Sequence, residues 1–431
     1  MMTHTDYYYL PAKAGKNLLE SDFDKLRPVV TSDGPPRGFL LIDTFDGAVR
    51  KSGRLLMNTG DTLELLSPET GVLRQSSGVV AGYVAAIEAG DVKEALSDVS
   101  PLRALQTIGT GDIQEVALAF LDSAQKTRVR ARLWFLHSNA GGAAALVILQ
   151  GLRGYDKALS QVRTHISAAG ATQIGDSALY TALFPGQPLY TAKPDVMIGS
   201  EEAAFDAAND IIATYLPIAR VNEPGIVADI DIEFLHDYRI ALRKIRSVLS
   251  LFRGVYDEKT TASLKARFSD LMSETGQLRD LDVYLAEKDK FYSLLPKTLH
   301  AGLDALFDLF SDRRIAEQER LKHHLQSASY AKEMDALKTL FGKKKKKLGK
   351  GENADLPALK YSSKLIWKRY RKVCEIASGI DDKTEDEEVH KLRIHCKKLR
   401  YLMEFFGPVF TKQDFNSYLG PVKRLQDVLG R

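Results

Sequence analysis

The segment HKLRIHCKKLRYLMEFF, residues 390–406, determines how the second half of this 431-residue chain is interpreted. A matching segment, HDYRIALRKIRSVLSLF, occupies residues 236–252. Each copy begins with His, has Arg three residues later, and has cations seven, eight and ten residues later. Five matching positions are not expected by chance, so we interpret the segments as a tandem repeat. The matched residues are His236, Arg239, Arg243, Lys244 and Arg246 in one copy, and His390, Arg393, Lys397, Lys398 and Arg400 in the other.

This spacing places most of the charges on one side of a helix. At about 100° per residue, the first, fourth, eighth and eleventh positions fall within a strip about 80° wide. Leucine, isoleucine, methionine and phenylalanine occupy the opposite side. Each segment is therefore predicted to be an amphipathic helix that packs through its apolar side and presents positive charge on the other.

An ordinary surface helix also has one apolar and one charged side, but it usually mixes charges, because like charges four residues apart are destabilising. Here the only acid within 236–246 is Asp237, and 390–400 contains none. Such repeated self-repulsion indicates a partner of opposite charge. Arginine presents a planar donor pair that suits phosphate oxygens, and a nearby phosphate would favour protonated His. We therefore predict an anion-binding surface.

The composition is typical of a globular protein with two or three domains, since 44% of residues are hydrophobic and 27% are charged. No run approaches the ~18 apolar residues that a membrane span needs. The N-terminus lacks the basic start and apolar core of a secretory signal, so we expect a cytoplasmic protein without membrane contact. Residues 1–200 contain 19 Lys and Arg against 20 Asp and Glu, and residues 201–431 contain 41 against 36. An anion site in the second half must therefore come from the arrangement of charges.

The two cysteines, Cys374 and Cys396, form neither a disulfide framework nor a metal-type cluster, and we expect two reduced thiols. His395 and Cys396 have no counterparts in the first copy of the repeat, where Ala241 and Leu242 stand. Both residues are therefore left out of the predicted site.

The first half of the chain is predicted to be mixed and largely β. In 115–136, Arg128, Arg130 and Arg132 alternate along one arm of a hairpin and share one face of a strand. That face either contacts anions or is simply solvated, and the pattern leaves both interpretations open. The other expected elements are a strand at 39–47, a hairpin at 53–67, a helical segment at 93–108 that Pro101 interrupts, a buried strand at 144–150 and a helix at 156–169.

A Pro-rich segment at 184–195 is typical of a linker, and only helical patterns follow it. The run GKKKKKLGKG at 342–351 is either a solvated loop or a mobile cationic arm for a polyanion. We expect breaks at Pro224-Gly225, Pro296, Gly342 and Gly407-Pro408. The predicted helices are 201–220, 232–254, 258–290, 294–327, 329–341, 357–379, 385–406 and 412–430.

The two basic helices, together with GQLRDLDVYL at 276–285, resemble the CHAD family, named for its conserved histidines in an α-helical domain. The resemblance covers about residues 200–431 and implies two pseudo-symmetric four-helix bundles whose basic helices face a shared groove or pore. It also implies binding of inorganic polyphosphate by the ten matched residues, and association with polyphosphate granules. Arg279, Asp280 and Asp282 match the family's Arg-Asp-x-Asp element, whose acids we expect to brace the basic helices.

The second half of the family usually continues past the equivalent of LQDVLGR, residues 425–431, with a polar element and a final helix. This chain stops at Arg431, which predicts a shortened second bundle.

Residues 1–195 resemble the CYTH, or triphosphate tunnel, domain through 40–56, the basic strand 126–136 and the segment 146–159. Enzymes of that superfamily hold divalent metal with an early Glu-x-Glu-x-Lys strand, whereas this chain has HTDYYYLPAK at 4–13. Metal-assisted hydrolysis needs those carboxylates. The N-terminal domain is therefore predicted to be a degenerate CYTH-like domain without catalytic activity, metal or cofactor. The predicted fold class of the chain is α+β, with this mostly antiparallel domain followed by the helical domain.

Two alternatives to polyphosphate binding remain. The first is a phosphohydrolase in the N-terminal domain, with Asp43, Asp46, Glu64 or Asp122 as metal ligands. The second is nucleic-acid binding, which we disfavour because aliphatic rather than aromatic residues separate the charges of the basic helices.

Overall fold

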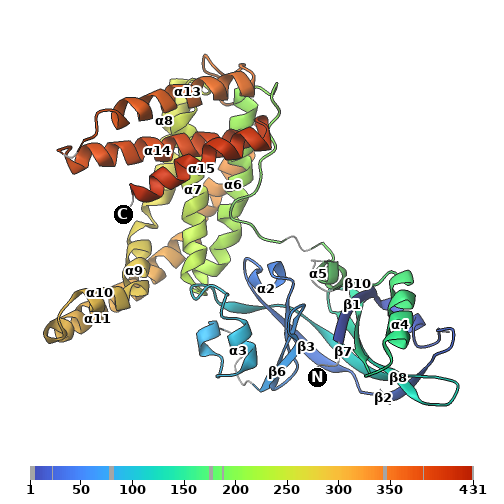
Figure 1. Ribbon diagram of the computed structural model, residues 1–431. Coiled ribbons are helices and arrows are strands. Elements are labelled where there is room, and N and C mark those ends of the chain that lie inside the picture. Colours follow the sequence, from blue (N-terminus) through green and yellow to red (C-terminus); the bar gives the residue numbers. More distant parts are fainter. Residues whose placement is uncertain are drawn as a thin grey trace. The chain divides into compact units, whose positions relative to one another are not determined.

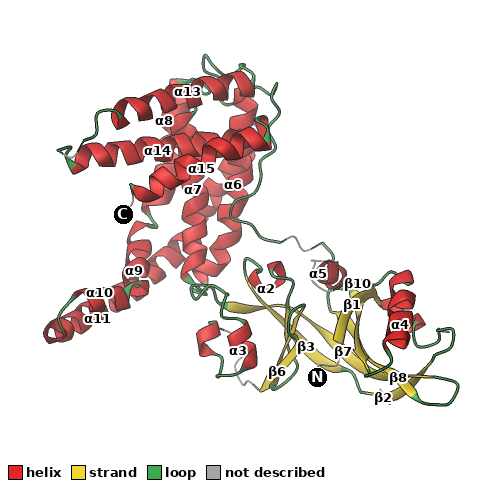
Figure 2. Cartoon of the chain, viewed as in Figure 1, coloured by secondary structure: helices red, strands yellow, loops and turns green. Residues whose placement is uncertain are grey.

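The computed structural model describes residues 5–21, 23–76, 82–173, 178–186, 189–342, 347–381 and 383–429 (Figure 1). The chain forms two compact units, Met1–Thr191 and Ala192–Arg431. Strands are found in the first unit, and the elements of the second are helices (Figure 2). The predicted fold class, a largely antiparallel β region followed by an all-α region, is confirmed. Within the described ranges, no helix is both long and apolar enough to cross a membrane.

The first unit is built on an antiparallel sheet with the strand order β10-β1-β9-β8-β7-β3-β4-β5-β6, and β2 pairs with β7. Strand β1, which is next to the end strand β10, approaches the other end strand, β6. A Cβ atom added to Gly71 of β6 would stand only 1.9 Å from the Tyr7 hydroxyl of β1. Gly71 also has a φ of 75°, which favours glycine. The strands are β1 (Thr5–Pro11), β2 (Arg27–Asp33), β3 (Arg37–Thr44), β4 (Leu55–Asn58), β5 (Thr62–Ser67), β6 (Gly71–Ser76), β7 (Leu105–Leu121), β8 (Thr127–Ser138), β9 (Ala143–Gly151) and β10 (Thr172–Gln173).

Short helices cover this sheet. Alternate residues of the long strands point to opposite faces, so Leu133 packs with Val162 of α4 while Trp134 packs with Leu183 of α5. Apolar clusters on both faces therefore stabilise the sheet. The helices are α1 (Ala12–Asn17), α2 (Ala48–Lys51), α3 (Asp91–Ala95), α4 (Asp156–Ala168) and α5 (Ala178–Leu183).

The structure confirms both predicted hairpins, the strand at 144–150 and the helix at 156–169. The prediction of helical structure over 93–108 is correct only at its start and is wrong after residue 95. Helix α3 ends at Ala95 and β7 begins at Leu105. The reason is tertiary, because β3 pairs with the start of β7, with Thr44 opposite Leu105, and Leu105 packs with Ile42 in an apolar cluster.

The second unit is helical, and its two repeats meet at their first helices. The Ala204 backbone N–H donates to the Leu356 carbonyl (2.9 Å), and the Ala358 N–H donates to the Glu202 carbonyl (2.7 Å). Ala204 and Ala358 are 154 residues apart, which is also the separation of His236 and His390. The reciprocal bonds therefore support a tandem repeat. The helices are α6 (Ala204–Val227), α7 (Ile232–Leu251), α8 (Glu258–Ser273), α9 (Gly276–Ala286), α10 (Lys288–Leu294), α11 (His300–Leu325), α12 (Ala328–Phe341), α13 (Ala358–Ala377), α14 (Asp386–Phe406) and α15 (Lys412–Val428).

Two helix predictions need correction. Helix α6 continues to Val227 through Pro217 and Pro224, both of which are exposed. Gly225 is a packing position rather than a break, because an added Cβ atom would stand 2.2 Å from the Phe234 ring of α7. The predicted helix 258–290 is three helices, α8, α9 and α10, the first two separated at 274–275. Of the lysine run, residues 343–346 lie outside the described residues, as do residues 430 and 431 at the end of the chain.

The apolar ends of α7 and α14 bring the two basic helices together. Phe252, just after α7, stacks on Phe406, the last residue of α14, with ring centroids 4.7 Å apart and planes inclined by 15°. These phenylalanines are equivalent in the repeat, and both are buried.

The start of α7 is fixed by Asp231, whose side chain accepts hydrogen bonds from the backbone N–H groups of Glu233 (2.9 Å) and Phe234 (3.3 Å).

We predict that Asp231→Ala lowers the free energy of unfolding of the helical unit by about 1 kcal/mol, because the first turn of α7 loses its side-chain cap. Asp231→Asn is the matched control, since the amide oxygen can still accept these bonds. Urea denaturation followed by circular dichroism measures the difference. Equal midpoints for the alanine and asparagine variants would contradict the prediction.

Candidate anion-binding site

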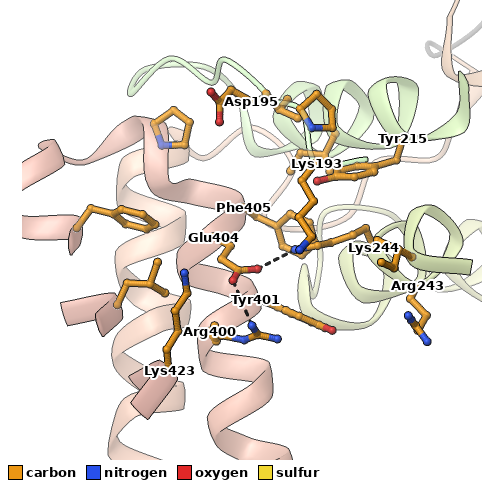
Figure 3. A pocket seen from close by; sticks show the side chains of 17 residues that line it. Lys193, Asp195, Tyr215, Arg243, Lys244, Arg400, Tyr401, Glu404, Phe405 and Lys423 are labelled. Atoms are coloured by element: carbon orange, nitrogen blue, oxygen red, sulfur yellow. Dashed lines mark hydrogen bonds and ion pairs between the residues drawn. The ribbon is translucent and has the colours of Figure 1, made fainter. Parts of the chain in front are cut away.

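A pocket of about 460 Å³ lies in the helical unit between α7 and α14, and residues of α6, α15 and segment 193–196 also line it (Figure 3). Positive charge predominates among its ionisable side chains. The cations are Lys193, Arg243, Lys244, Arg400 and Lys423, and the acids are Asp195 and Glu404. The remaining lining residues are apolar or tyrosine, so the pocket offers cations on an otherwise poorly polar wall.

Glu404 joins the two basic helices inside this pocket. Its carboxylate lies 2.8 Å from Lys244 Nζ of α7 and 3.6 Å from Arg400 Nη1, one turn earlier on α14 (Figure 3). Lys244 is only 9% exposed, and burial lowers the pKa of its ammonium while the Glu404 charge and hydrogen bond oppose that shift. Glu404 is therefore the group that keeps a buried lysine charged.

Tyr401 presents its ring to the cations of the pocket. Lys244 Nζ lies 4.7 Å from the ring centroid, the Arg400 guanidinium carbon 5.2 Å and Lys397 Nζ 5.9 Å. These distances are those of cation–π contacts, which stabilise partly desolvated cations. The Tyr401 ring is therefore already covered by the protein's own positive charge.

Cations from the two repeats repel one another beside the pocket. Burial lowers the pKa of Lys397 on α14, and the charges of Arg243 on α7 and of Arg400 lower it further. Burial also lowers the pKa of Arg243. For Arg243, Lys397 and the exposed Arg393, no anionic partner is found within the described part of the chain. A bound anion would relieve this repulsion.

Arg239 lies about one turn before Arg243 on α7, and Arg246 lies about one turn after it. Arg239 Nη1 donates to the Thr275 hydroxyl (2.6 Å) at the turn between α8 and α9, so this side chain also holds α7 in place. Burial lowers the Arg239 pKa, followed by the Arg243 charge, while Asp280 opposes the shift. Arg246 also contributes to that shift and therefore lies within electrostatic range of Arg239.

The Arg-Asp-x-Asp element braces α7 from behind. Asp282 is 2% exposed and accepts a hydrogen bond from Arg314 Nε of α11 (3.0 Å). Arg314 also donates to Asp229, next to the start of α7 (2.6 Å). Arg279 Nη1 donates to the Ile232 carbonyl in the first turn of α7 (3.3 Å). Arg279 therefore contacts α7 directly, whereas Asp282, one of the two acids expected to brace the basic helices, acts only through Arg314.

Of the ten predicted residues, only Arg243, Lys244 and Arg400 line the pocket, and His236, His390 and Lys398 are among the seven that do not. His390 is exposed at the start of α14, and His236 is half-buried on α7. Lys398 lies near Arg369 and Arg253, whose charges add to burial in lowering its pKa. Lys398 is equivalent to Lys244, but Ser250 stands where an acid equivalent to Glu404 would be needed. The repeat is therefore asymmetric in charge at this position.

His395 and Cys396, which were left out of the predicted site, do not line the pocket. Arg369 Nη1 lies 3.2 Å from His395 Nδ1, and the Cys396 thiol is buried in an apolar cluster. Sequence reasoning missed Lys193, Tyr401, Glu404 and Lys423, because comparing two copies finds only shared positions. A signal for Glu404 existed, since it is the first acid after a long acid-free stretch of α14 and stands four residues after Arg400.

Two of the acids considered as metal ligands in the N-terminal unit each have hydrogen-bond partners of their own. The buried Asp43 carboxylate accepts from the Val49 and Arg50 N–H groups at α2 (2.8 and 2.9 Å). Glu64 accepts from Thr59 Oγ1 (3.0 Å) and Arg74 Nη2 (3.3 Å). Within the described ranges, no three His, Cys, Asp or Glu side chains gather in a way that could hold a metal ion.

The three arginines of β8 have different surroundings. Arg128 Nε donates to Asp122 (2.7 Å), and its guanidinium lies 4.3 Å from the Tyr155 ring centroid. Arg130 and Arg132 instead line a cavity of about 570 Å³ in the sheet unit. The Arg132 guanidinium lies 3.6 Å from Glu115, so its charge is partly compensated.

Comparison with known proteins gives the following matches. The CHAD domain model matches residues 210–431. Among solved structures, the CHAD domain from the plant Ricinus communis is 25% identical, with a TM-score of 0.45, and the match covers 56% of this chain and 78% of that chain. PptA from Streptomyces chartreusis is 13% identical, with a TM-score of 0.37, covering 52% and 82%. A putative adenylate cyclase from Bacillus halodurans is 15% identical, with a TM-score of 0.25, covering 40% and 92%. None of the curated proteins matches the chain.

We predict that Glu404→Gln lowers the free energy of unfolding by about 1–3 kcal/mol at neutral pH, because buried Lys244 loses its counter-charge. The Lys244 pKa is already below its usual 10.5, and the substitution lowers it further. The cost of burying the ammonium is therefore fully present below the folded-state pKa and disappears as pH rises from there towards 10.5. Urea denaturation at neutral pH and at about pH 9.5 should show the deficit shrinking at the higher pH.

The double variant Lys244→Met, Glu404→Gln is the control, because it removes both charges together. It should be more stable than Glu404→Gln alone. A deficit that is independent of pH, or a double variant no better than the single one, would show that Glu404 does not serve Lys244.

Proposed function

Because the chain belongs to the CHAD domain family, whose model matches more than half of it, we propose that it binds inorganic polyphosphate through the basic groove between α7 and α14. The observation that carries the proposal is the convergence of cations from both repeats. Arg243 of α7 and Lys397 of α14 lie within electrostatic range of each other, with Arg400 beside them. The proposed binding set is the one taken from the repeat, with Arg243, Lys244, Lys397 and Arg400 at its centre.

The shape of the charged surface suits a chain rather than a compact anion. From the pocket, the basic row continues along α14 through Lys397 and Arg393 to His390, all three exposed. Ten residues of helix span about 15 Å. Polyphosphate is a flexible polyanion with about one charge per unit, so its affinity would come from many cation–phosphate contacts and the release of counterions. We also propose that the protein is cytoplasmic and associates with polyphosphate granules.

Two other functions have less support. Binding of nucleic-acid bases in the groove would need a free aromatic surface, whereas three cations already lie against the Tyr401 ring. A phosphohydrolase in the N-terminal unit would need acids gathered around a metal, and Asp43 and Glu64 are held apart by their own hydrogen bonds. We therefore assign no catalytic role.

We predict that the triple variant Arg243→Glu, Lys397→Glu, Arg400→Glu weakens polyphosphate binding by at least about tenfold at low salt, because three charge-assisted contacts are lost. The slope of log Kd against log salt should also fall by about 2, at roughly 0.7 per lost contact for a single chain. Titration of labelled polyphosphate between about 50 and about 200 mM salt measures both quantities.

A charge-matched control reverses Arg27, Lys51 and Lys157, three exposed cations of the N-terminal unit, and should leave the Kd within about twofold. Arg239 is kept in all variants, because its bond to Thr275 positions α7. If both triple variants weakened binding equally, net charge would explain the affinity, and the groove proposal would be wrong.

A further inference from the structure

The side of α13 that faces away from the protein core carries a second concentration of positive charge. Helix α13 contains six Lys and Arg residues and a single acid, Glu375. At about 100° per residue, four of the cations and two aromatic residues share one side of the helix. We call this set the outer side of α13. It consists of Lys360, Lys364, Trp367, Lys368, Tyr370 and Arg371.

The outer side is exposed, whereas the opposite side packs. Val373 is buried and Ile366 is partly buried against an apolar cluster with residues of α14 and α15. Figure 1 shows α13 alongside α14 at the margin of the helical unit. The residues lining the pocket between α7 and α14 include none from α13, so the outer side is a separate surface.

Two aromatic rings stand in solvent among these cations. Trp367 is 59% exposed and Tyr370 is 47% exposed, with ring centroids 5.7 Å apart and planes inclined by 31°. Exposing large apolar side chains is unfavourable, so adjacent exposed aromatic residues on one helix point to a binding partner.

The cations around these rings are not neutralised within the protein. Over the described ranges, no ion pair or side-chain hydrogen bond is found for Lys360, Lys364, Lys368 or Arg371. The lone acid, Glu375, is already paired with Lys372 at 2.7 Å. The outer side therefore combines uncompensated positive charge with free aromatic faces.

We propose that the outer side of α13 binds single-stranded nucleic acid, with bases stacking on Trp367 and Tyr370 and phosphates contacting the surrounding lysines and Arg371. Cationic surfaces with exposed aromatic rings bind single strands in this way, because every base offers a π-face and every nucleotide a charge. The charges of α7 and α14 are separated by aliphatic residues, which offer bases no stacking surface. Helix α13 differs, because exposed Trp367 and Tyr370 lie among its cations.

The chemistry of the outer side distinguishes this partner from others. Polyphosphate would attract the cations but leave both rings in water, because it has no planar groups. A helix lying in a membrane interface needs a broad apolar face, and the outer side offers two aromatic residues among four cations. A partner that carries both negative charge and flat rings uses all six residues.

Fluorescence of Trp367 gives a direct test on the full chain. The other tryptophan, Trp134, is fully buried in the N-terminal unit, so the difference between the wild type and Trp367→Phe isolates the Trp367 emission. An oligouridylate of about 15 nucleotides should quench this emission, whereas polyphosphate of equal charge should not. Trp367→Ala and Tyr370→Ala should each weaken oligouridylate binding by about 5- to 100-fold and leave polyphosphate binding unchanged.

Tyr418→Ala is the matched control, since Tyr418 is 67% exposed on α15 of the same unit, and it should not change the affinity. Three results would overturn the proposal. One is oligouridylate binding that persists in Trp367→Ala and Tyr370→Ala. Another is oligouridylate binding that is lost in the triple variant Arg243→Glu, Lys397→Glu, Arg400→Glu but kept in Trp367→Ala and Tyr370→Ala. That result would assign the nucleic acid to α7 and α14. The last is Trp367 emission that responds to anionic vesicles and not to oligouridylate, which would identify a membrane surface.

Discussion

The contact between Phe252 and Phe406 is the interaction on which the proposed basic groove depends. The two rings stack at 4.7 Å, and both are buried. Burying each side chain contributes about 1.5–3 kcal/mol and the aromatic contact about 0.5–1.5 kcal/mol more, whereas a like-charge pair on a helix surface costs a few tenths of a kcal/mol. Apolar contact at the ends of α7 and α14 can therefore hold Arg243 of α7 near Lys397 and Arg400 of α14 despite their like charges. A polyanion would then meet a groove whose cations are already positioned, and less ordering would oppose binding.

The groove is nevertheless asymmetric, and Glu404 is the source of the asymmetry. It compensates Lys244 and Arg400, while the equivalent position in the first repeat is Ser250. A buried ammonium without a counter-charge would lose its proton or destabilise the fold. Glu404 avoids both outcomes but also offers an incoming anion a competing negative charge. The strongest attraction should therefore lie beside Arg243 and Lys397, for which no such carboxylate is found within the described part of the chain.

The repeat and its periodicity were sufficient to predict α7, α14 and the side of each helix that carries charge, because both depend on local spacing. They could not predict contacts between distant segments. Leu105 is a strand residue because β3 pairs with it, and Pro217 is tolerated in α6 because it stands on the exposed side. Lys398 has the correct spacing but lies beside Arg369 and Arg253 rather than in the pocket. In each case the deciding neighbour lies on another element, and the order of residues along one helix does not contain it.

Charge alone does not separate the surfaces of this protein, but the state of the nearby aromatic rings does. In the groove, Tyr401 lies against three cations of the protein, so its π-face stabilises those cations. On α13, Trp367 and Tyr370 are exposed, and their neighbouring cations occupy the same side of the helix. The surface around Tyr401 should therefore favour a ligand that carries charge but no flat rings. The surface around Trp367 and Tyr370 should favour a charged ligand whose planar groups can also stack. The two proposed polyanion surfaces of the helical unit should therefore differ in the ligands that they prefer, because stacking on exposed rings contributes to only one of them.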